Sequence, residues 1–189
     1  MKAGLRRIAA VFISVCILGI TGCSGNSNVT SEEWAYIHEP GVTVLELKSD
    51  GKAVYHNVDY SYTLEDGWLT LKDKAGNEQK LRFTPHDEDG MFIYEPAVYE
   101  LREDFELNGV IGYWQQIDGN KTLSFEFTDK GTFREDYYSP GRYMVDEKAG
   151  TIKLVYNDMY EDTVIYYHID GRIMTVEYPW PLVRTEKQS

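Results

Sequence analysis

Apolar and polar residues alternate with a period of two along most of the chain from residue 34 onward. In residues 123–128, three apolar side chains alternate with three polar ones, and residues 58–64 and 152–156 have the same period. This period places the apolar side chains on one face of an extended strand and the others on the opposite face. Such segments are typical of antiparallel sheets that pack on a core on one side and meet water on the other.

Short groups containing Gly, Asp, Asn or Pro separate these segments. They lie at 49–51, 66–67, 75–77, 89–90, 118–120, 130–131, 140–141, 149–150 and 170–171. Gly, Asn and Asp adopt the positive φ angles that tight hairpins need. No segment carries a sustained helical period, and the only helix we expect is one or two turns within 103–108. The chain is therefore predicted to be all-β, either a sandwich or an up-and-down barrel.

The sequence also matches itself at an offset of about 80 residues, which indicates an internal duplication. The matched residues are Trp34 with Trp114, Gly51 with Gly131, Glu95 with Glu177 and Arg102 with Arg184. A tryptophan thus opens each half and an arginine closes it. We expect two units, 33–104 and 111–186, joined by a linker at 105–110. The strands expected in the second unit are 111–116, 122–128, 131–138, 142–147, 151–157, 163–169, 172–178 and 182–186.

The repeated tryptophan and arginine predict a specific contact. The first and last strands of a closed meander are neighbours, so an arginine on the last can stack on an indole of the first. We therefore expect Arg184 to lie over Trp114 in the second unit, and Arg102 over Trp34 in the first. This contact would close one end of each unit, which is a structural role.

Four short motifs of the second unit resemble a known family. They are residues 112–114 (GYW), 129–133 (DKGTF), 141–143 (GRY) and 182–184 (LVR). Together they resemble the short lipocalin-like repeat domains of uncharacterised bacterial lipoproteins. The first unit matches less well, although it keeps Trp34 and Arg102. The resemblance implies two tandem antiparallel meander or up-and-down small β-barrel units with very little helix.

The first 22 residues have the plan of a secretory signal. Basic residues near the N-terminus precede an apolar run at 8–20, which is too short to span a bilayer. The run ends in Ile20, two small residues and Cys23, which resembles the lipobox of bacterial lipoproteins. That resemblance implies a lipid on Cys23 and a place on the extracytoplasmic face of the cell membrane. An ordinary secretory signal with an incidental cysteine is the alternative, and polar residues 23–32 are read as a flexible tether.

Charge and cysteine content exclude several classes of function. The chain has 189 residues and a net charge of −12, which disfavours nucleic acid as a partner because phosphate binding needs Lys and Arg. Removal of the first 22 residues leaves 16 basic and 31 acidic residues, a net charge of −15. Cys16 lies in the removed segment and Cys23 takes the lipid. The mature domain would therefore hold no disulfide, catalytic thiolate or cysteine metal site.

The remaining polar residues form no strong catalytic motif. The four histidines, His38, His56, His86 and His168, stand apart from one another, so we expect no zinc site. The acidic turn at 87–89 is a weak alternative for calcium. Acid pairs at 135–136 and 161–162 leave glycoside hydrolysis open as an alternative. We predict no catalytic residue, no metal and no cofactor.

Aromatic residues give the last sequence signal. Neighbouring residues on a strand face opposite ways, so one of Tyr137 and Tyr138, and one of Tyr166 and Tyr167, points away from the core. With Trp180 they would form an interaction surface, unless these rings are simply good strand formers. The expected function is a non-enzymatic, lipid-anchored module of the cell envelope that binds a protein, a glycan or a small amphiphile. An envelope-polymer hydrolase and a structural spacer are the alternatives.

Overall fold

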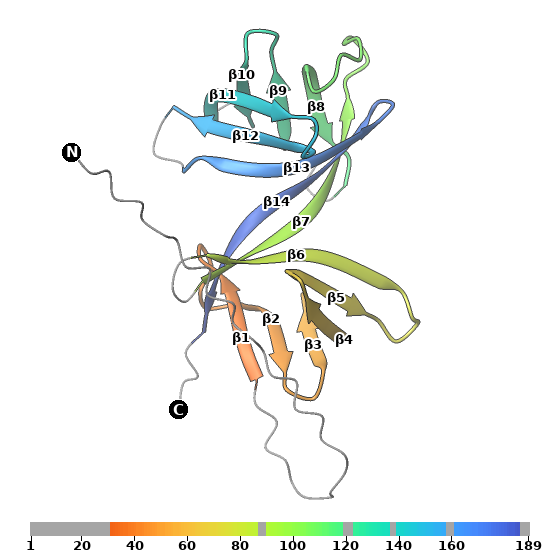
Figure 1. Ribbon diagram of the computed structural model, residues 1–189, viewed down its shortest axis with the longest axis vertical. Helices are drawn as coiled ribbons and strands as arrows, with labels where there is room; N and C mark the ends of the chain where they lie inside the picture. The colour runs from red at the N-terminus through yellow and green to blue at the C-terminus, as the bar shows by residue number, and fades with distance from the viewer. Residues whose placement is uncertain (1–30, 87–89, 119–122, 137–138, 158–160, 186–189) are drawn as a thin grey trace, which may run out of the picture.

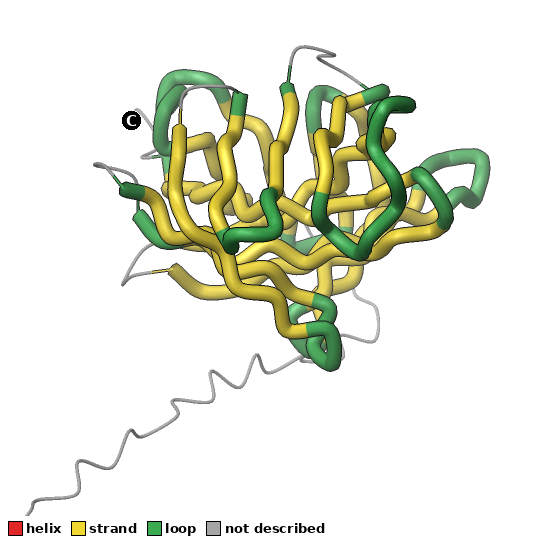
Figure 2. Tube along the Cα trace, turned by 90° about the horizontal axis from the view of Figure 1, so that it is seen from above, coloured by secondary structure: helices red, strands yellow, loops and turns green. Residues whose placement is uncertain are grey.

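The computed structural model describes residues 31–86, 90–118, 123–136, 139–157 and 161–185. Within these residues the chain is all-β, with no helix, and strands make up most of its length (Figure 2). None of these residues forms a helix long and apolar enough to cross a membrane. The strands are β1 (Ser31–Tyr36), β2 (Thr43–Lys48), β3 (Lys52–Tyr55), β4 (Val58–Glu65), β5 (Trp68–Lys72), β6 (Glu78–His86), β7 (Gly90–Leu101), β8 (Gly112–Gln116), β9 (Ser124–Phe127), β10 (Thr132–Glu135), β11 (Ser139–Asp146), β12 (Thr151–Tyr156), β13 (Thr163–Asp170) and β14 (Ile173–Arg184).

All fourteen strands of the described residues belong to one antiparallel sheet. Each strand pairs with the strands before and after it in the chain, and β1 pairs with β14, so the order closes on itself. β7 and β14 also pair with each other, from Ile173 opposite Glu100 to Val183 opposite Gly90. These two strands form a long ribbon that joins two lobes (Figure 1). We call β1–β6 with the adjoining ribbon ends the N-terminal lobe, and β8–β13 with the other ribbon ends the C-terminal lobe.

Each ribbon strand pairs with both lobes. The start of β7 pairs with β6 and its end with β8, whereas the start of β14 pairs with β13 and its end with β1. The expected closing strand of the second half therefore pairs with the first strand of the chain. A period of two shows which face of its strand a side chain occupies, but it does not show which strand lies alongside. The sequence therefore could not predict that the last strand pairs with the first strand of the chain.

The expectation of separate strands at 172–178 and 182–186 is wrong, because β14 runs unbroken through both. Pro179 and Pro181 lie within β14, although proline has no N–H to donate to a sheet. Along the register, β13 pairs with β14 up to Glu177 and β1 pairs from Leu182 onward. Both prolines thus lie where β14 has β7 as its paired strand, with no second strand in register beside them among the described residues.

One face of the ribbon supplies the core of both lobes. At one end, Tyr99 lies opposite Met174 and both belong to the core of the C-terminal lobe. At the other end, Ile93 and Leu182 belong to the core of the N-terminal lobe. Partners in an antiparallel register share a face. Glu95 and Tyr178, which lie opposite each other between these ends, mark the point where the face passes from one lobe to the other.

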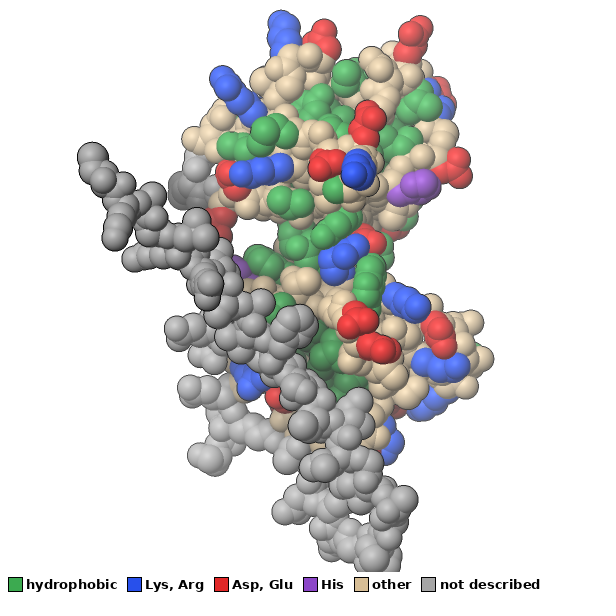
Figure 3. Space-filling model, viewed as in Figure 1, with side chains coloured by type: hydrophobic (Ala, Val, Ile, Leu, Met, Phe, Trp, Pro, Cys, Tyr) green, Lys and Arg blue, Asp and Glu red, His purple; other side chains and the backbone are tan. Residues whose placement is uncertain are grey.

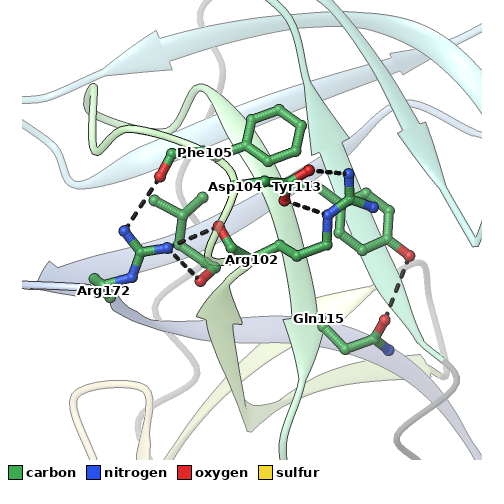
Figure 4. Close-up of polar contacts among 7 residues, drawn as sticks. Arg102, Asp104, Phe105, Tyr113, Gln115 and Arg172 are labelled. Carbon is green, nitrogen blue, oxygen red and sulfur yellow. Dashed lines mark hydrogen bonds and ion pairs between the residues drawn. The ribbon is translucent and has the colours of Figure 1, made fainter.

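The short helix expected within 103–108 is absent, and these residues form a turn, irregular backbone and an isolated bridge from Asn108 to Ile111. The guanidinium group of Arg172 donates hydrogen bonds to the carbonyl oxygens of Leu101 at 2.9 Å, Arg102 at 2.7 Å and Phe105 at 3.2 Å (Figure 4). In a helix such carbonyls would accept from backbone N–H groups four residues later. A side chain from the turn before β14 takes that place, which a local sequence pattern could not reveal.

Candidate functional site

The predicted pairing of Arg184 with Trp114 is wrong, because Arg184 lies over Trp34. The two residues are directly opposite in the β1–β14 register, and the guanidinium carbon is 5.0 Å from the centroid of the indole. Arg184 also forms an ion pair with Glu32 at 3.1 Å. Trp114 is fully buried opposite Leu101 and donates its indole N–H to a backbone carbonyl.

Arg102 does not stack on Trp34 either, and instead lies over Tyr113, 4.7 Å from the ring centroid, and Phe105, 5.1 Å away. Its guanidinium group also binds the carboxylate of Asp104 at 2.6 and 2.8 Å (Figure 4). The two arginines thus keep the predicted kind of contact, a cation over a ring, but with different partners. Trp34 and Trp114 are buried in the cores of the two lobes, whereas the side chains of Arg102 and Arg184 are about half exposed.

The aromatic residues predicted to form a surface lie in different surroundings. Tyr137 and Tyr138 fall outside the described residues. Tyr167 packs on the core of the C-terminal lobe, whereas Tyr166 lies under the guanidinium group of Arg82 on the other face of β13, 3.7 Å from it. Trp180 is half-buried against the core of the N-terminal lobe. The three described residues, Tyr166, Tyr167 and Trp180, therefore do not form one patch.

The structure gathers a polar cluster around Glu95. The hydroxyl groups of Tyr36 and Tyr55 both donate to Oε1 of Glu95, the second at 2.5 Å, and Nε2 of His56 lies 3.3 Å from the same oxygen. These residues come from β1, β3, the turn after β3, and β7. Tyr36, His56 and Glu95 are tens of residues apart and share no motif, so no sequence pattern could predict this cluster.

The hydrogen bonds keep Glu95 ionised although it is largely buried. Burial acts to raise the pKa of its carboxyl group, but the bonds from His56, Tyr36 and Tyr55 outweigh it and lower the pKa below its usual value. Burial and the adjacent carboxylate raise the pKa of Tyr36 and of Tyr55. Both tyrosines therefore stay protonated at neutral pH and act as hydrogen-bond donors to a negative charge.

Aromatic rings extend this cluster from one lobe to the other. The ring of Tyr36 stacks on His38 with centroids 5.3 Å apart and lies 5.9 Å from the ring of Trp180. Trp180 lies 5.4 Å from the ring of Tyr178, whose hydroxyl is 3.3 Å from that of Tyr156 in β12. We call the whole set the interlobe cluster; its members are Tyr36, His38, Tyr55, His56, Glu95, Glu135, Tyr156, Tyr178 and Trp180.

A second carboxylate ends the interlobe cluster in the C-terminal lobe. Glu135, the last residue of β10, accepts a hydrogen bond from the hydroxyl of Tyr156. Burial raises the pKa of Glu135 to about 7, with a smaller contribution from the negative charge of Asp136 and an opposing one from the Tyr156 bond. At neutral pH Glu95 is therefore ionised, and Glu135 titrates.

The acid pairs considered for hydrolysis have structural partners. Asp136 accepts a hydrogen bond from the backbone N–H of Ser124 at 2.8 Å, and Asp162 forms an ion pair with Lys153 at 2.8 Å. Glu161 is exposed. The acidic turn at 87–89 lies outside the described residues. In the part of the chain that the structure describes, no three His, Cys, Asp or Glu residues are placed to hold a metal ion.

Charged side chains of both signs lie on the face of the molecule drawn in Figure 3. Figure 3 shows acidic and basic groups intermixed on the visible face of both lobes, with hydrophobic side chains reaching the surface at the waist between them.

Neither a protein-family model, nor a curated protein, nor a solved structure matches this chain. The arrangement of its own residues is therefore what a proposal of function has to rest on.

Proposed function

We propose that this protein is a non-enzymatic binding module, held by a lipid on Cys23 at the extracytoplasmic face of a bacterial cell membrane. Its ligand, a protein, a glycan or a small amphiphile, binds at the interlobe cluster. The observation that carries this proposal is the carboxylate of Glu95, which stays ionised in a largely aromatic surround and keeps 21% of its side chain exposed. A charge held this way is ready to pair with a ligand.

The surrounding rings favour binding over a purely structural spacer. Tyrosine and tryptophan give a large contact area at a low cost in conformational entropy, and they are enriched where proteins bind partners. Tyr36 and Trp180 are only partly buried and His38 is exposed, so part of each side chain is open to a ligand. A spacer would need neither an ionised carboxylate nor exposed rings at the waist of the molecule.

The surroundings of the acid pairs favour binding over hydrolysis. Glycoside hydrolysis uses two carboxyl groups on either side of one bond, about 5–10 Å apart. In the described residues the acid pairs at 135–136 and 161–162 include members bound to backbone or to lysine.

We further propose that the closed strand order and the two core clusters correspond to two small lipocalin-like barrels that exchange their closing strands.

The binding proposal is tested by capture from envelope extract with the immobilised full chain. Glu95→Gln keeps a hydrogen-bond acceptor for Tyr36 and Tyr55 but removes the charge, and Trp180→Ala removes a ring. We expect both variants to lose the captured component. Glu100→Gln is the matched control, because Glu100 lies on β7 as well but is exposed. Equal capture by all four proteins would overturn the proposal.

The anchor is tested separately, by cell fractionation and labelling with a clickable fatty acid. Cys23→Ser should abolish the label and either release the protein from membranes or leave it uncleaved. A variant that fractionates and migrates like the wild type would show that Cys23 is an incidental residue of an ordinary secretory signal.

A further inference from the structure

The two oxygens of Glu95 have different surroundings. Tyr36, Tyr55 and His56 all lie at Oε1, and none of the described residues donates a hydrogen bond to Oε2. Oε2 is not among the described buried atoms that lack a partner, which are Nε1 of Trp34, Oε1 of Gln116 and Oγ1 of Thr185. Since 21% of the Glu95 side chain is exposed, the described part of the chain leaves Oε2 as an acceptor without a donor, on a carboxylate that the protein already holds in place.

Glu95 also lacks a permanent cation. His56 is the one basic side chain within ion-pair distance of it among the residues that the structure describes, at 3.3 Å, and its imidazole is half exposed. Glu177, which matches Glu95 in the internal repeat, differs in this respect because Arg82 lies 3.4 Å from its carboxylate. The donors at Oε1 outweigh the cost of burying this charge, but in the described residues no fixed cation neutralises it, so the carboxylate can still pair with a ligand of opposite charge.

We propose that the ligand of this site carries a primary ammonium group, which donates to Oε2 of Glu95 beside the rings of Tyr36 and His56. The open oxygen selects a group that has N–H donors, and the aromatic surround suits a cation on an apolar stem. The negative net charge of the chain, −12, would attract such a ligand over a distance. This inference rests on the function proposed above, since it names the chemistry of the same site.

The test uses calorimetric titration of the full chain in a nonionic detergent. The probes are n-propylammonium, propyltrimethylammonium, which has the charge but no N–H, and 1-propanol, which has no charge. We expect the order of affinity to be propylammonium, then propyltrimethylammonium, with no binding of propanol. Glu95→Gln should weaken propylammonium at least ten-fold, because a charge-assisted hydrogen bond is lost, whereas Glu100→Gln should leave its affinity unchanged. Affinity should fall as salt is added.

Folding and function are separated by two further measurements. The thermal melt of Glu95→Gln, with its retained acceptor, establishes that a loss of affinity is not a loss of fold. Glu95-dependent capture of an envelope component, together with no binding of propylammonium or equal binding of propanol, would overturn the ammonium ligand and leave the binding module standing. If the protein shows neither Glu95-dependent capture nor binding of propylammonium, both proposals are overturned. Ten-fold weaker amine binding by a folded Glu95→Gln supports both.

Discussion

Arg184 of the last strand lies over Trp34 of the first, with its guanidinium carbon 5.0 Å from the centroid of the indole. The two residues are directly opposite in the register that joins β1 to β14, and Trp34 is 3% exposed. This contact ties the C-terminal end of the described chain to its N-terminal lobe. The last strand, β14, therefore packs against residues from the first half of the chain.

Arg184→Ala should therefore lower the stability of the protein. The change removes a cation–π contact and the apolar stem that covers the indole, at a cost of about 1 kcal/mol because the arginine is exposed. The expected fall in melting temperature is roughly 2–4 °C. Arg184→Lys keeps the charge but not the planar guanidinium group, so it should lose less stability than Arg184→Ala but remain less stable than the wild type. Full stability of Arg184→Ala would show that the stack contributes nothing.

Arg82 should hold the two lobes at a fixed relative orientation. Its guanidinium carbon lies 4.4 Å from the ring centroid of Trp68 in the N-terminal lobe and 3.7 Å from the ring centroid of Tyr166 in the C-terminal lobe. Arg82→Ala should cost about 1–2 kcal/mol and speed hydrogen exchange in β13 and β14. Lysine should not rescue it, because only the planar guanidinium group stacks on both rings. Arg134→Ala, at an exposed position of β10, serves as the control. Unchanged exchange in β13 would contradict this role.

Glu135 should make stability depend on pH. Its pKa is raised in the folded protein to about 7 from 4.5, so the folded state favours the protonated form. The stabilising contribution of this group is complete below about pH 4.5 and is lost as the pH rises through 7. Glu135→Gln should therefore match the wild type at pH 4 and exceed its stability at pH 8, by at most about 3 kcal/mol. Urea melts at the two pH values measure this, and a difference independent of pH would refute it.

A fragment of residues 110–189 should not fold on its own. It lacks β7, which pairs with β14 from Ile173 to Val183 and with β8, and it lacks β1, which pairs with the end of β14. Circular dichroism should show no cooperative melt for this fragment. Co-expression with residues 31–109 should restore β structure, because the missing strands return. A cooperative β-type melt of the isolated fragment would instead show that the second half closes by itself.

The sequence by itself determined the class of the fold and most of its strands. The alternation at 58–64, 123–128 and 152–156 corresponds to β4, β9 and β12, and turn glycines such as Gly51 and Gly131 have the positive φ angles that hairpins need. These features could be predicted because they depend on neighbours along the chain. A period of two and a turn residue each act over only a few positions.

Only the tertiary structure decided which strands pair across the waist and which residues meet there. The pairing of β7 and β14 with each other and with both lobes depends on packing between distant segments. Glu95 illustrates the consequence. Its donors come from β1, β3 and the turn after β3, and their convergence on one oxygen depends on the register of several strands at once. No local pattern encodes such a convergence, because each residue alone is an ordinary member of a half-buried sheet.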